Sequence, residues 1–394
     1  MKQDDIVIVA AKRTPAGSML GGLSPLSAPE LGAIAHKAAI AQACLSPNDI
    51  DEVFSGCVLQ AGIGQAPARQ AALKANIPNA TGATTINKMC GSGMKSVMLG
   101  HDAIKAGSAN IVLAGGMESM SNAPYLLSKA RSGYRLGHGE LKDHMFLDGL
   151  EDAYERGKLM CCFAEATAKH FNFSREQQDA FATRSTTRAL QAQKAGAFDE
   201  EIVPVTIAGR KGDTIVKQDQ GPDAEKMAKI PQLKPAFQAD GTVTAANSSS
   251  ISDGAASLIL MTAENAEKRG LKPLAKIVAH ASHAQEPQWF TTAPVEAIRK
   301  VLAKAGWKAD EVDLYEINEA FAVVAMAAVH ELKLDIEKVN IHGGACALGH
   351  PIGASGARIL VTLIYALKHL KKTRGVAALC IGGGEATAMA IEVL

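Results

Sequence analysis

Two widely separated parts of the chain follow the same plan. A helical stretch leads through the acidic turn Leu45–Val53 into a strand, and another leads through Trp307–Tyr315 in the same way, 262 residues later. The pair Ser92-Gly93 opens a helix, and Ser355-Gly356 opens another 263 residues later. Two matching offsets predict that an α/β unit has been duplicated. Equivalent ends of the two copies can then face a single pocket.

Within each copy, short apolar runs alternate with amphipathic helical stretches, a pattern typical of layered α/β proteins. The expected strands are Ile6–Ala10, Ile111–Gly115 and Val376–Ile381, and the expected helices are Leu31–Cys44, Gly93–Ala106, Val295–Ala305 and Ala354–Leu370. Gly115-Gly116 and Gly382-Gly383 each end a strand, so we expect them to occupy equivalent places, with about four more helical residues in the second copy. Gly382–Gly384 is also expected to turn a hairpin.

A segment without this rhythm interrupts the first copy between Ser121 and Asn247. Its clearest helix is predicted to begin at Ser174, where Gln177 completes a capping box, and to end at Gly196. The chain returns to the first copy near residue 251. The predicted division is an N-terminal half of residues 1–120 plus 248–270, an inserted domain of residues 121–247, and a C-terminal half of residues 271–394.

Composition excludes several classes of function. Lys and Arg number 41 and Asp and Glu number 40, so the formal charge of +1 gives no global attraction to nucleic acid or to an anionic membrane. No apolar run reaches the roughly 20 residues of a membrane span, and the start of the chain does not resemble a signal peptide. We therefore expect a cytoplasmic protein. Its seven cysteines show no CxxC spacing, so neither a disulfide framework nor a metal site is expected.

Two residues stand at glycine-rich helix starts. Cys90 precedes Gly91-Ser92-Gly93, where the helix dipole and free N–H groups are expected to lower the pKa of its thiol and make it a nucleophile. The alternative is a buried cysteine with no chemical role. His350 lies before Pro351 in a rigid turn, where it could deprotonate a thiol or polarise a carbonyl group. The alternative is a histidine that only makes structural hydrogen bonds.

Two further candidates lie at strand ends. Cys380 stands directly before three glycines, at the end of a strand where α/β proteins build their sites, although a cysteine in a strand often serves only as a small apolar residue. Asn318 follows the expected strand Val312–Ile317, and Glu319 comes next. This pair fits either a site or the N-cap and first turn of the apolar helix that follows.

Together these segments resemble the thiolases. The resemblance covers essentially the whole chain and rests on motifs in the same order, namely Asn87–Gly93, Gly115–Met120, Asn318–Phe321, His342–Gly344 with Gly349–Gly356, and Cys380–Gly384. It implies a duplicated fold with five layers, α-β-α-β-α, and an inserted loop domain that covers coenzyme A. It also implies an oligomer, commonly a dimer of dimers.

The resemblance further implies roles for particular residues. Cys90 would take the acyl group from an acyl-CoA, His350 would activate that thiol, and Cys380 would remove the α-proton of acetyl-CoA. Asn318 would hold a water that forms one oxyanion hole with His350, and the N–H groups of Cys90 and Gly382 would form the other. The predicted contacts to coenzyme A and its acyl group are Met160, Ser249 and Phe321.

The implied reaction is the reversible condensation of two acetyl-CoA to acetoacetyl-CoA and CoA. Coenzyme A thioesters are its substrates, and no metal or redox cofactor is needed. One alternative is a 3-ketoacyl-CoA thiolase of broader chain length, with Met160 favouring short chains. Another is a carrier of acyl-CoA or lipid that forms no covalent adduct. A zinc site at Cys161, Cys162 and His170 is a further, less favoured interpretation.

Overall fold

A single large sheet runs through the molecule. The computed structural model describes all 394 residues, and its main sheet has ten strands in the order β12-β13-β14-β11-β1-β10-β5-β3-β4, with β2 paired to β10. These strands are β1 (Ile6–Arg13), β2 (Gly17–Ser18), β3 (Glu52–Gly56), β4 (Gly82–Ile86), β5 (Ile111–Ser119), β10 (Ser252–Thr262), β11 (Ala275–Ala284), β12 (Leu314–Ile317), β13 (Arg374–Ile381) and β14 (Glu385–Val393). All the expected strands are present.

The order of these strands confirms the duplication. The first half follows β3-β5-β10-β1 and the second follows β12-β13-β14-β11, and in both halves the first pairing is parallel and the others are antiparallel. The halves join where β1 meets β11, antiparallel, over only two residue pairs that include Ile8 and Ala275. The two halves of this one sheet therefore meet along one short seam.

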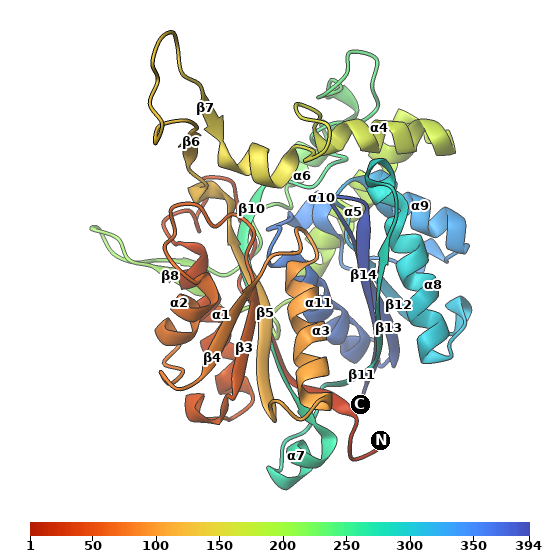
Figure 1. Cartoon of the computed structure of the whole chain (residues 1–394). Coiled ribbons are helices and arrows are strands. Elements are labelled where there is room, and N and C mark those ends of the chain that lie inside the picture. Colours follow the sequence, from red (N-terminus) through yellow and green to blue (C-terminus); the bar gives the residue numbers. More distant parts are fainter.

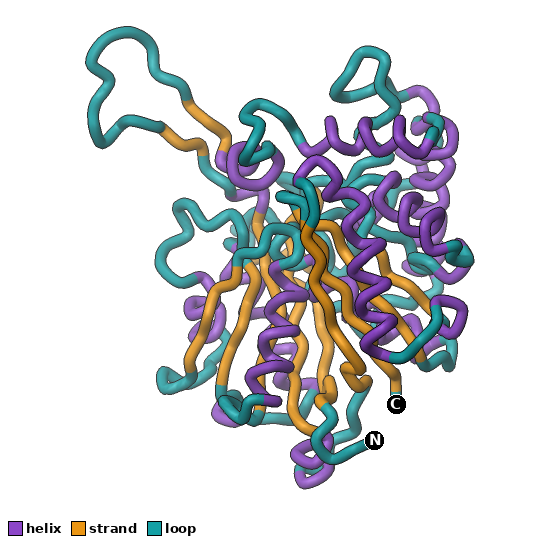
Figure 2. The backbone as a smooth tube through the Cα atoms, turned by 45° about the vertical axis from the view of Figure 1, so that its right-hand side comes forward, coloured by secondary structure: helices purple, strands orange, loops and turns teal.

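Helices cover both halves and fill the space between them, which gives five layers (Figure 1). Helices α1 (Ala28–Gln42) and α2 (Pro67–Lys74) cover the outer face of the first half, and α8 (Ala293–Ala305) and α9 (Ala322–Leu332) cover that of the second. Helices α3 (Ser92–Lys105) and α11 (Ser355–His369) form the middle layer, and α11 lies in the largest apolar cluster. The tube in Figure 2 shows the strands side by side with these helices packed on them.

The register of the strands corrects one expectation. Val53 pairs with Leu113 in the first half, and Tyr315 pairs with Val376 in the second, so the repeat keeps an offset of 263 residues along β5 and β13. Cys380 is therefore equivalent to Met117. The glycine pairs Gly115-Gly116 and Gly382-Gly383 are not equivalent, and α11 has 15 residues against 14 in α3. The two glycine pairs look alike in sequence, which suggested that they occupy the same place in the repeat. The strand pairing shows that they do not.

Two glycines let the middle helices touch. A Cβ atom on Gly93 would lie 2.8 Å from the backbone nitrogen of Ala357, and one on Gly356 would lie within 3.1 Å of the backbone Cα of Met94. These contacts are related by the repeat, since both residues of each contact shift by 263 positions. Helices α3 and α11 thus cross at equivalent points, with backbone against backbone.

The segment predicted as an insert contributes most of the structure at one end of the molecule. It contains α4 (Met160–Phe171), α5 (Arg175–Lys194), α6 (Ala224–Met227) and the hairpins β6–β7 (Tyr125–Leu127 and Leu141–Asp143) and β8–β9 (Val205–Ile207 and Thr214–Val216). As expected, Ser174 and Gln177 form a capping box at the start of α5. The β6–β7 hairpin and its loop project from the body as an arm (Figure 1). The domain boundaries at residues 121 and 247 stay a prediction.

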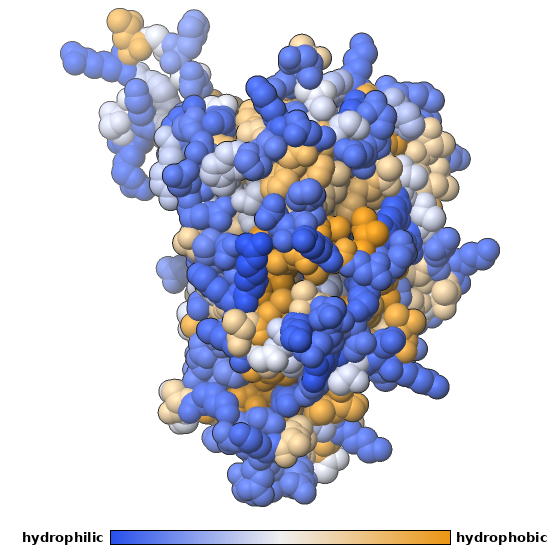
Figure 3. Space-filling view, turned by 90° about the vertical axis from the view of Figure 1, so that its right-hand side faces the viewer, coloured by the Kyte–Doolittle hydropathy of each residue, from blue (hydrophilic) through white to orange (hydrophobic).

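The side of the molecule that carries α8 and α9 is mostly hydrophilic, with an apolar strip in a hollow near its middle (Figure 3). No helix is both long enough and apolar enough to span a bilayer.

The close crossing of the middle helices predicts an unusual response to Gly93→Ala. Alanine normally stabilises a helix by about 1 kcal/mol relative to glycine. Here the added methyl group meets backbone atoms of α11 that cannot rotate away. We expect a net loss of about 1–3 kcal/mol in the free energy of unfolding, measured by urea denaturation or as a fall in Tm.

The control is Gly100→Ala in the same helix, where the new Cβ meets only side-chain atoms of Leu260, Val112 and Ala114. We expect the smaller effect there. An equal loss in both variants would show that the backbone contact has no special cost.

Candidate active site

Four segments at one end of the sheet bring the predicted site residues together. Cys90 lies in the loop between β4 and α3, Asn318 follows β12, His350 lies between α10 (Ala345–Leu348) and α11, and Cys380 is the last residue but one of β13. The N–H of Gly382 reaches the thiol of Cys90. The side-chain nitrogen of Asn318 lies 3.5 Å from His350 Nδ1. The two halves of the molecule thus supply one site.

The Cys90 loop is held in a strained shape. Met89 has a φ of 47°, in the left-handed region, and the residue after the cysteine is Gly91, where a Cβ would collide with the side chain of Ile381. The hydroxyl of Ser92 accepts the N–H of Lys88 at 2.8 Å and donates to the carbonyl oxygen of Met89 at 2.6 Å. These contacts fix the position of the sulfur between the first helix turn of α3 and strand β13.

The expected lowering of the Cys90 pKa is wrong for the free protein. Burial of the sulfur raises the pKa to about 11, although the N–H groups of Gly382 and of Cys90 itself act in the opposite direction. Desolvation of the thiolate therefore outweighs the helix start. At neutral pH Cys90 is a thiol, and its use as a nucleophile requires a base beside it.

His350 has the properties of that base. Its Nδ1 lies 2.6 Å from Ser355 Oγ, and the Ser355 hydroxyl lies 3.0 Å from the carbonyl oxygen of Pro351. If the hydroxyl donates to that carbonyl, it accepts from Nδ1–H, and this assigns the tautomer with an unprotonated Nε2. Burial, and to a smaller degree Arg358, lowers the His350 pKa to about 3, so the ring is neutral at pH 7. No protein group bonds to Nε2.

Asn318 also presents an unused polar atom. Its backbone N–H donates to Ala378, its side chain is almost fully buried, and its Oδ1 has no protein partner. Helix α9 begins at Ala322 with Phe321 as N-cap, so Asn318 is not the cap of that helix. Buried polar atoms without partners are rare. Two of them, His350 Nε2 and Asn318 Oδ1, on neighbouring residues indicate a place for a polar ligand or a water.

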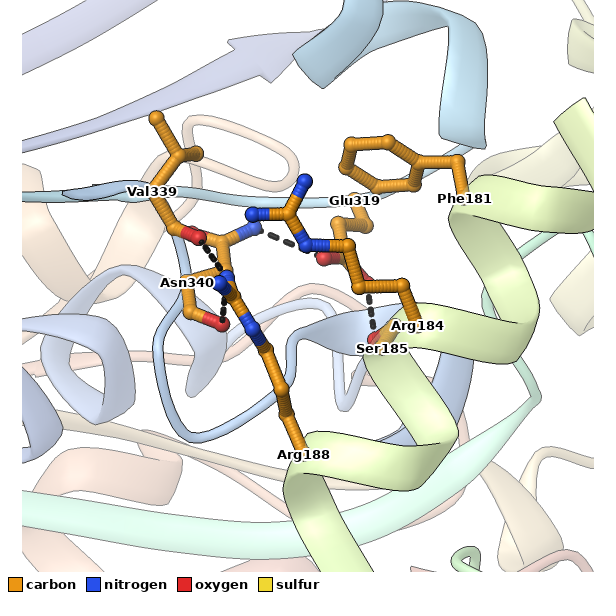
Figure 4. A pocket seen from close by; sticks show the side chains of 7 residues that line it. All are labelled: Phe181, Arg184, Ser185, Arg188, Glu319, Val339 and Asn340. Atoms are coloured by element: carbon orange, nitrogen blue, oxygen red, sulfur yellow. Dashed lines mark hydrogen bonds between the residues drawn. The ribbon is translucent and has the colours of Figure 1, made fainter. Parts of the chain in front are cut away.

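Glu319 anchors this loop to the inserted segment. Its carboxylate accepts hydrogen bonds from Ser185 Oγ at 2.7 Å, from Asn340 Nδ2 at 2.8 Å and from the N–H of Cys346 at 3.1 Å. Figure 4 shows Ser185 and Arg188 on α5 facing Glu319 and Asn340. The two residues of the polar pair therefore have different contacts. Asn318 lies next to His350, and Glu319 binds α5 to the loop that follows β12.

Cys380 is fully buried at the end of β13. Burial is the main cause that raises its pKa well above the usual value, and the nearby charge of Cys90 is the second. Gly383 and Gly384 follow with φ of 90° and 88°, which only glycine adopts readily. This turn leads directly into β14 and forms the predicted hairpin.

The three predicted coenzyme A and acyl contacts lie beside these loops. Met160 begins α4, and its sulfur would lie 3.6 Å from a Cβ on Gly382. Phe321 packs with Met160 against the same apolar cluster that contains Cys380. The half-buried Ser249 donates its N–H to the carbonyl oxygen of Ala320 at 2.9 Å. Their contacts with a ligand, like the chemical roles of Cys90, His350, Cys380, Asn318 and Gly382, stay predictions.

The structure adds Glu118, which has no role in the sequence-based prediction. Its buried carboxylate accepts the N–H groups of Val58 at 3.0 Å and Leu59 at 3.1 Å in the first half, and that of Gly353 at 2.9 Å in the His350 loop. Burial raises its pKa to about 7. One side chain thereby fixes the His350 loop to the opposite half. The only sequence signal was its place directly after Gly115-Gly116-Met117.

A duplicated α/β fold that brings two cysteines, a histidine and an asparagine into one buried site defines a thiolase-type acyltransferase. Residues 6–264 match the thiolase N-terminal domain, and residues 271–393 match the thiolase C-terminal domain. The chain belongs to the thiolase family.

Several relatives are similar along their whole length. The chain is 51% identical over 393 residues to acetyl-CoA acetyltransferase 2 of Arabidopsis thaliana, covering 99% of this chain and 97% of that relative. It is 50% identical to the acetyl-CoA acetyltransferase of Cupriavidus necator, covering 98% and 99%. The crystal structure of the Bacillus anthracis acetyl-CoA acetyltransferase superposes with a TM-score of 0.97 at 41% identity, covering 100% and 99% of the two chains. The thiolase fold is thus confirmed.

The raised pKa of Cys90 predicts how the free protein reacts with iodoacetamide. Because only the thiolate reacts, alkylation of Cys90 should accelerate by about tenfold per pH unit between pH 7 and pH 10, without a plateau. Mass spectrometry of the Cys90 peptide measures the rate, and the exposed Cys44 in the same digest reports on the reagent. A plateau below pH 8 would instead indicate a stabilised thiolate.

Proposed function

We propose that the protein is an acetyl-CoA C-acetyltransferase, which condenses two acetyl-CoA to acetoacetyl-CoA and CoA through an acyl-cysteine intermediate, reversibly. Two observations carry this proposal: the thiol of Cys90 lies beside Gly382 and Cys380, and the neighbouring residues Asn318 and His350 each leave a buried polar atom, Oδ1 and Nε2, without a protein partner. The names of relatives about half identical over the whole chain support the same reaction.

In the first half-reaction, His350 Nε2 accepts the proton of the Cys90 thiol. At the same time the sulfur forms a bond to the acetyl carbonyl carbon, and the bond from that carbon to coenzyme A then breaks. The departing CoA thiolate takes the proton back from His350 and leaves as a thiol. A thiol nucleophile suits this exchange because the attacking and leaving thiolates are close in energy. The N–H groups of Cys90 and Gly382 stabilise the oxyanion of the tetrahedral intermediate.

In the second half-reaction, Cys380 first loses its thiol proton to solvent, and the thiolate so formed removes the α-proton of a second acetyl-CoA; after the cycle Cys380 regains a proton from solvent. The resulting enolate attacks the acetyl carbon on Cys90, and the bond from that carbon to the Cys90 sulfur breaks. The Cys90 thiolate then recovers its proton from Cys380. Asn318 and His350 stabilise the enolate oxygen, through a water held by Asn318.

Coenzyme A thioesters are substrates in this scheme, and none of its steps uses a metal or a redox cofactor. The broader 3-ketoacyl-CoA thiolase is not favoured, because the relatives about half identical over the whole chain are named acetyl-CoA acetyltransferases and because Met160, the residue expected to favour short chains, lies beside Gly382. An acyl-CoA carrier would have no use for a second thiol beside the first.

Purified protein with free CoA tests the proposal by thiolysis. We expect acetoacetyl-CoA to be cleaved at least about ten times faster, in kcat/KM, than a medium-chain 3-ketoacyl-CoA. Equal or faster cleavage of the longer substrate would identify a degradative 3-ketoacyl-CoA thiolase. Absence of turnover with both, together with no acyl adduct on Cys90 by mass spectrometry, would favour the carrier.

A separate prediction divides the two half-reactions. Cys380→Ala should still form acetyl-Cys90 with acetyl-CoA but lose condensation by a factor of about 10² or more, because proton transfer at carbon has no base. Cys90→Ala should form no acyl adduct, and His350→Ala should slow both steps. Cys380→Ala with normal condensation would show that the base has been assigned incorrectly.

The proposed assembly is a homo-oligomer, a dimer of dimers. Strand β4 ends the sheet and pairs only with β3, so one edge of it is open to a second copy. The projecting arm carries five exposed large apolar side chains, at Tyr125, Leu127, Tyr134, Leu136 and Leu141, of which Leu136 is 98% exposed. Such a surface is typical of a contact between subunits.

Shortening the arm tests this assembly. Residues 128–140 can be replaced by Asn-Gly, which closes a two-residue hairpin directly after the pair Leu127 and Leu141. By light scattering we expect the full chain to be a tetramer and the shortened chain a dimer that retains thiolysis. A point variant, Leu136→Asp, should weaken the tetramer in the same direction. A shortened chain that stays tetrameric would contradict the role of the arm.

We also place the protein in the cytoplasm. All seven cysteines are free, and a mechanism with two thiols requires a compartment that keeps them reduced. Fractionation of the source cells with an antibody tests this proposal.

A further inference from the structure

Outside the active site, three side chains of metal-binding type meet at one point. His101 and Asp102 lie on α3, and His280 lies on β11, which is 179 residues away from His101 in the sequence. His101 follows the start of α3 by nine residues, so it lies about 13 Å along the helix from the Cys90 end. Figure 1 shows the lower part of α3 near β11, away from the loops of the active site.

The ligand atoms form a compact triangle. Asp102 Oδ1 lies 2.9 Å from His101 Nδ1 and 2.9 Å from His280 Nε2, and the two nitrogens are 3.2 Å apart. Donors that bind one zinc ion at about 2.0–2.1 Å in a tetrahedron are about 3.3 Å from each other. The imidazole rings are nearly perpendicular, at 86°, and their nitrogens converge on the same oxygen. Small side-chain rotations are enough to place a metal ion between the three atoms.

The chemistry of these groups also suits a metal. The two imidazoles are only 16–17% exposed, whereas Asp102 is 53% exposed and leaves a side open to water. Each imidazole offers a ring nitrogen as a ligand, and Asp102 offers a carboxylate oxygen.

We propose that His101, Asp102 and His280 bind a divalent transition-metal ion of the zinc type, with water completing the coordination. Two imidazoles, one carboxylate and an open position are a donor set that Zn²⁺ and Co²⁺ both accept. The amine of Lys304 donates to the carbonyl oxygen of His280 at 2.9 Å, and its positive charge lowers the affinity. The site therefore binds metal reversibly and is occupied according to supply.

The consequence is structural, because α3 belongs to the first half and β11 to the second. A metal ion there joins the two halves at the end opposite the catalytic loops. Its effect follows the linkage between binding and folding. At a free metal concentration of about one hundred times Kd, the Tm of a chain this long should rise by about 3 °C.

The test titrates the purified full-length protein with Co²⁺ and follows its visible absorption. We expect one Co²⁺ per chain, ligand-field bands of low symmetry and no thiolate-to-cobalt charge-transfer band, because the ligands are nitrogen and oxygen. Zn²⁺ should displace the Co²⁺ and raise Tm as stated. His280→Gln should lose at least about tenfold in affinity together with the Tm shift.

His283→Gln, on the same strand, is the matched control and should bind like the wild type, because His283 contacts Gln285 and Lys300 and lies outside the triangle. Asp102→Asn is a second variant that keeps the size of the side chain and should also lose affinity. A wild-type chain that binds no Co²⁺, a site unaffected by His280→Gln and Asp102→Asn, or a spectrum with thiolate ligation would overturn the proposal.

Discussion

The contact of α3 with α11 positions the two loops that carry Cys90 and His350. Gly93 and Gly356 allow the two helices to touch through their backbones, and the carbonyl oxygen of Gly353 fits into space left by Gly56 and Gly116. A methyl group at any of these positions would force the middle layer apart. Because Cys90 and His350 lie a few residues before these contacts, a shift of the helices would move the nucleophile and its base relative to each other. Catalytic geometry here depends on a packing distance.

The duplication explains where the functional groups come from. The equivalent serines Ser92 and Ser355 both close the loop before their helix, but Ser92 bonds only to backbone and Ser355 also holds the imidazole of His350. Cys90 is equivalent to Gly353, whose carbonyl and N–H pack against the first half. The two copies thus share the same backbone arrangement and differ in the side chains at equivalent positions.

Much of this arrangement could be predicted from sequence because it rests on local patterns. The capping box at Ser174 and the glycines around Cys90 and Cys380 are visible within short windows, and the repeat offset appears when two such windows are compared. The pKa of Cys90 could not be predicted, because it depends on burial by segments far away in the chain. The same holds for Glu118 and for the meeting of His101 with His280, which only the tertiary fold brings together. The sequence analysis wrongly treated Gly115 and Gly382 as equivalent because both begin a glycine pair. The register of β5 and β13, which is visible only in the fold, gives a different equivalence.

Burial gives the site its particular acid–base balance. It raises the pKa of both thiols and lowers that of His350, so at neutral pH all three groups are uncharged before substrate binds. A separated thiolate and imidazolium would be unstable in so desolvated a place. Proton transfer from Cys90 to His350 therefore has to coincide with attack on the thioester, when the developing charge moves onto an oxygen that faces N–H donors. An uncharged Cys90 is also protected from oxidants, because oxidants attack the thiolate. The thiol then becomes reactive only when a substrate occupies the site.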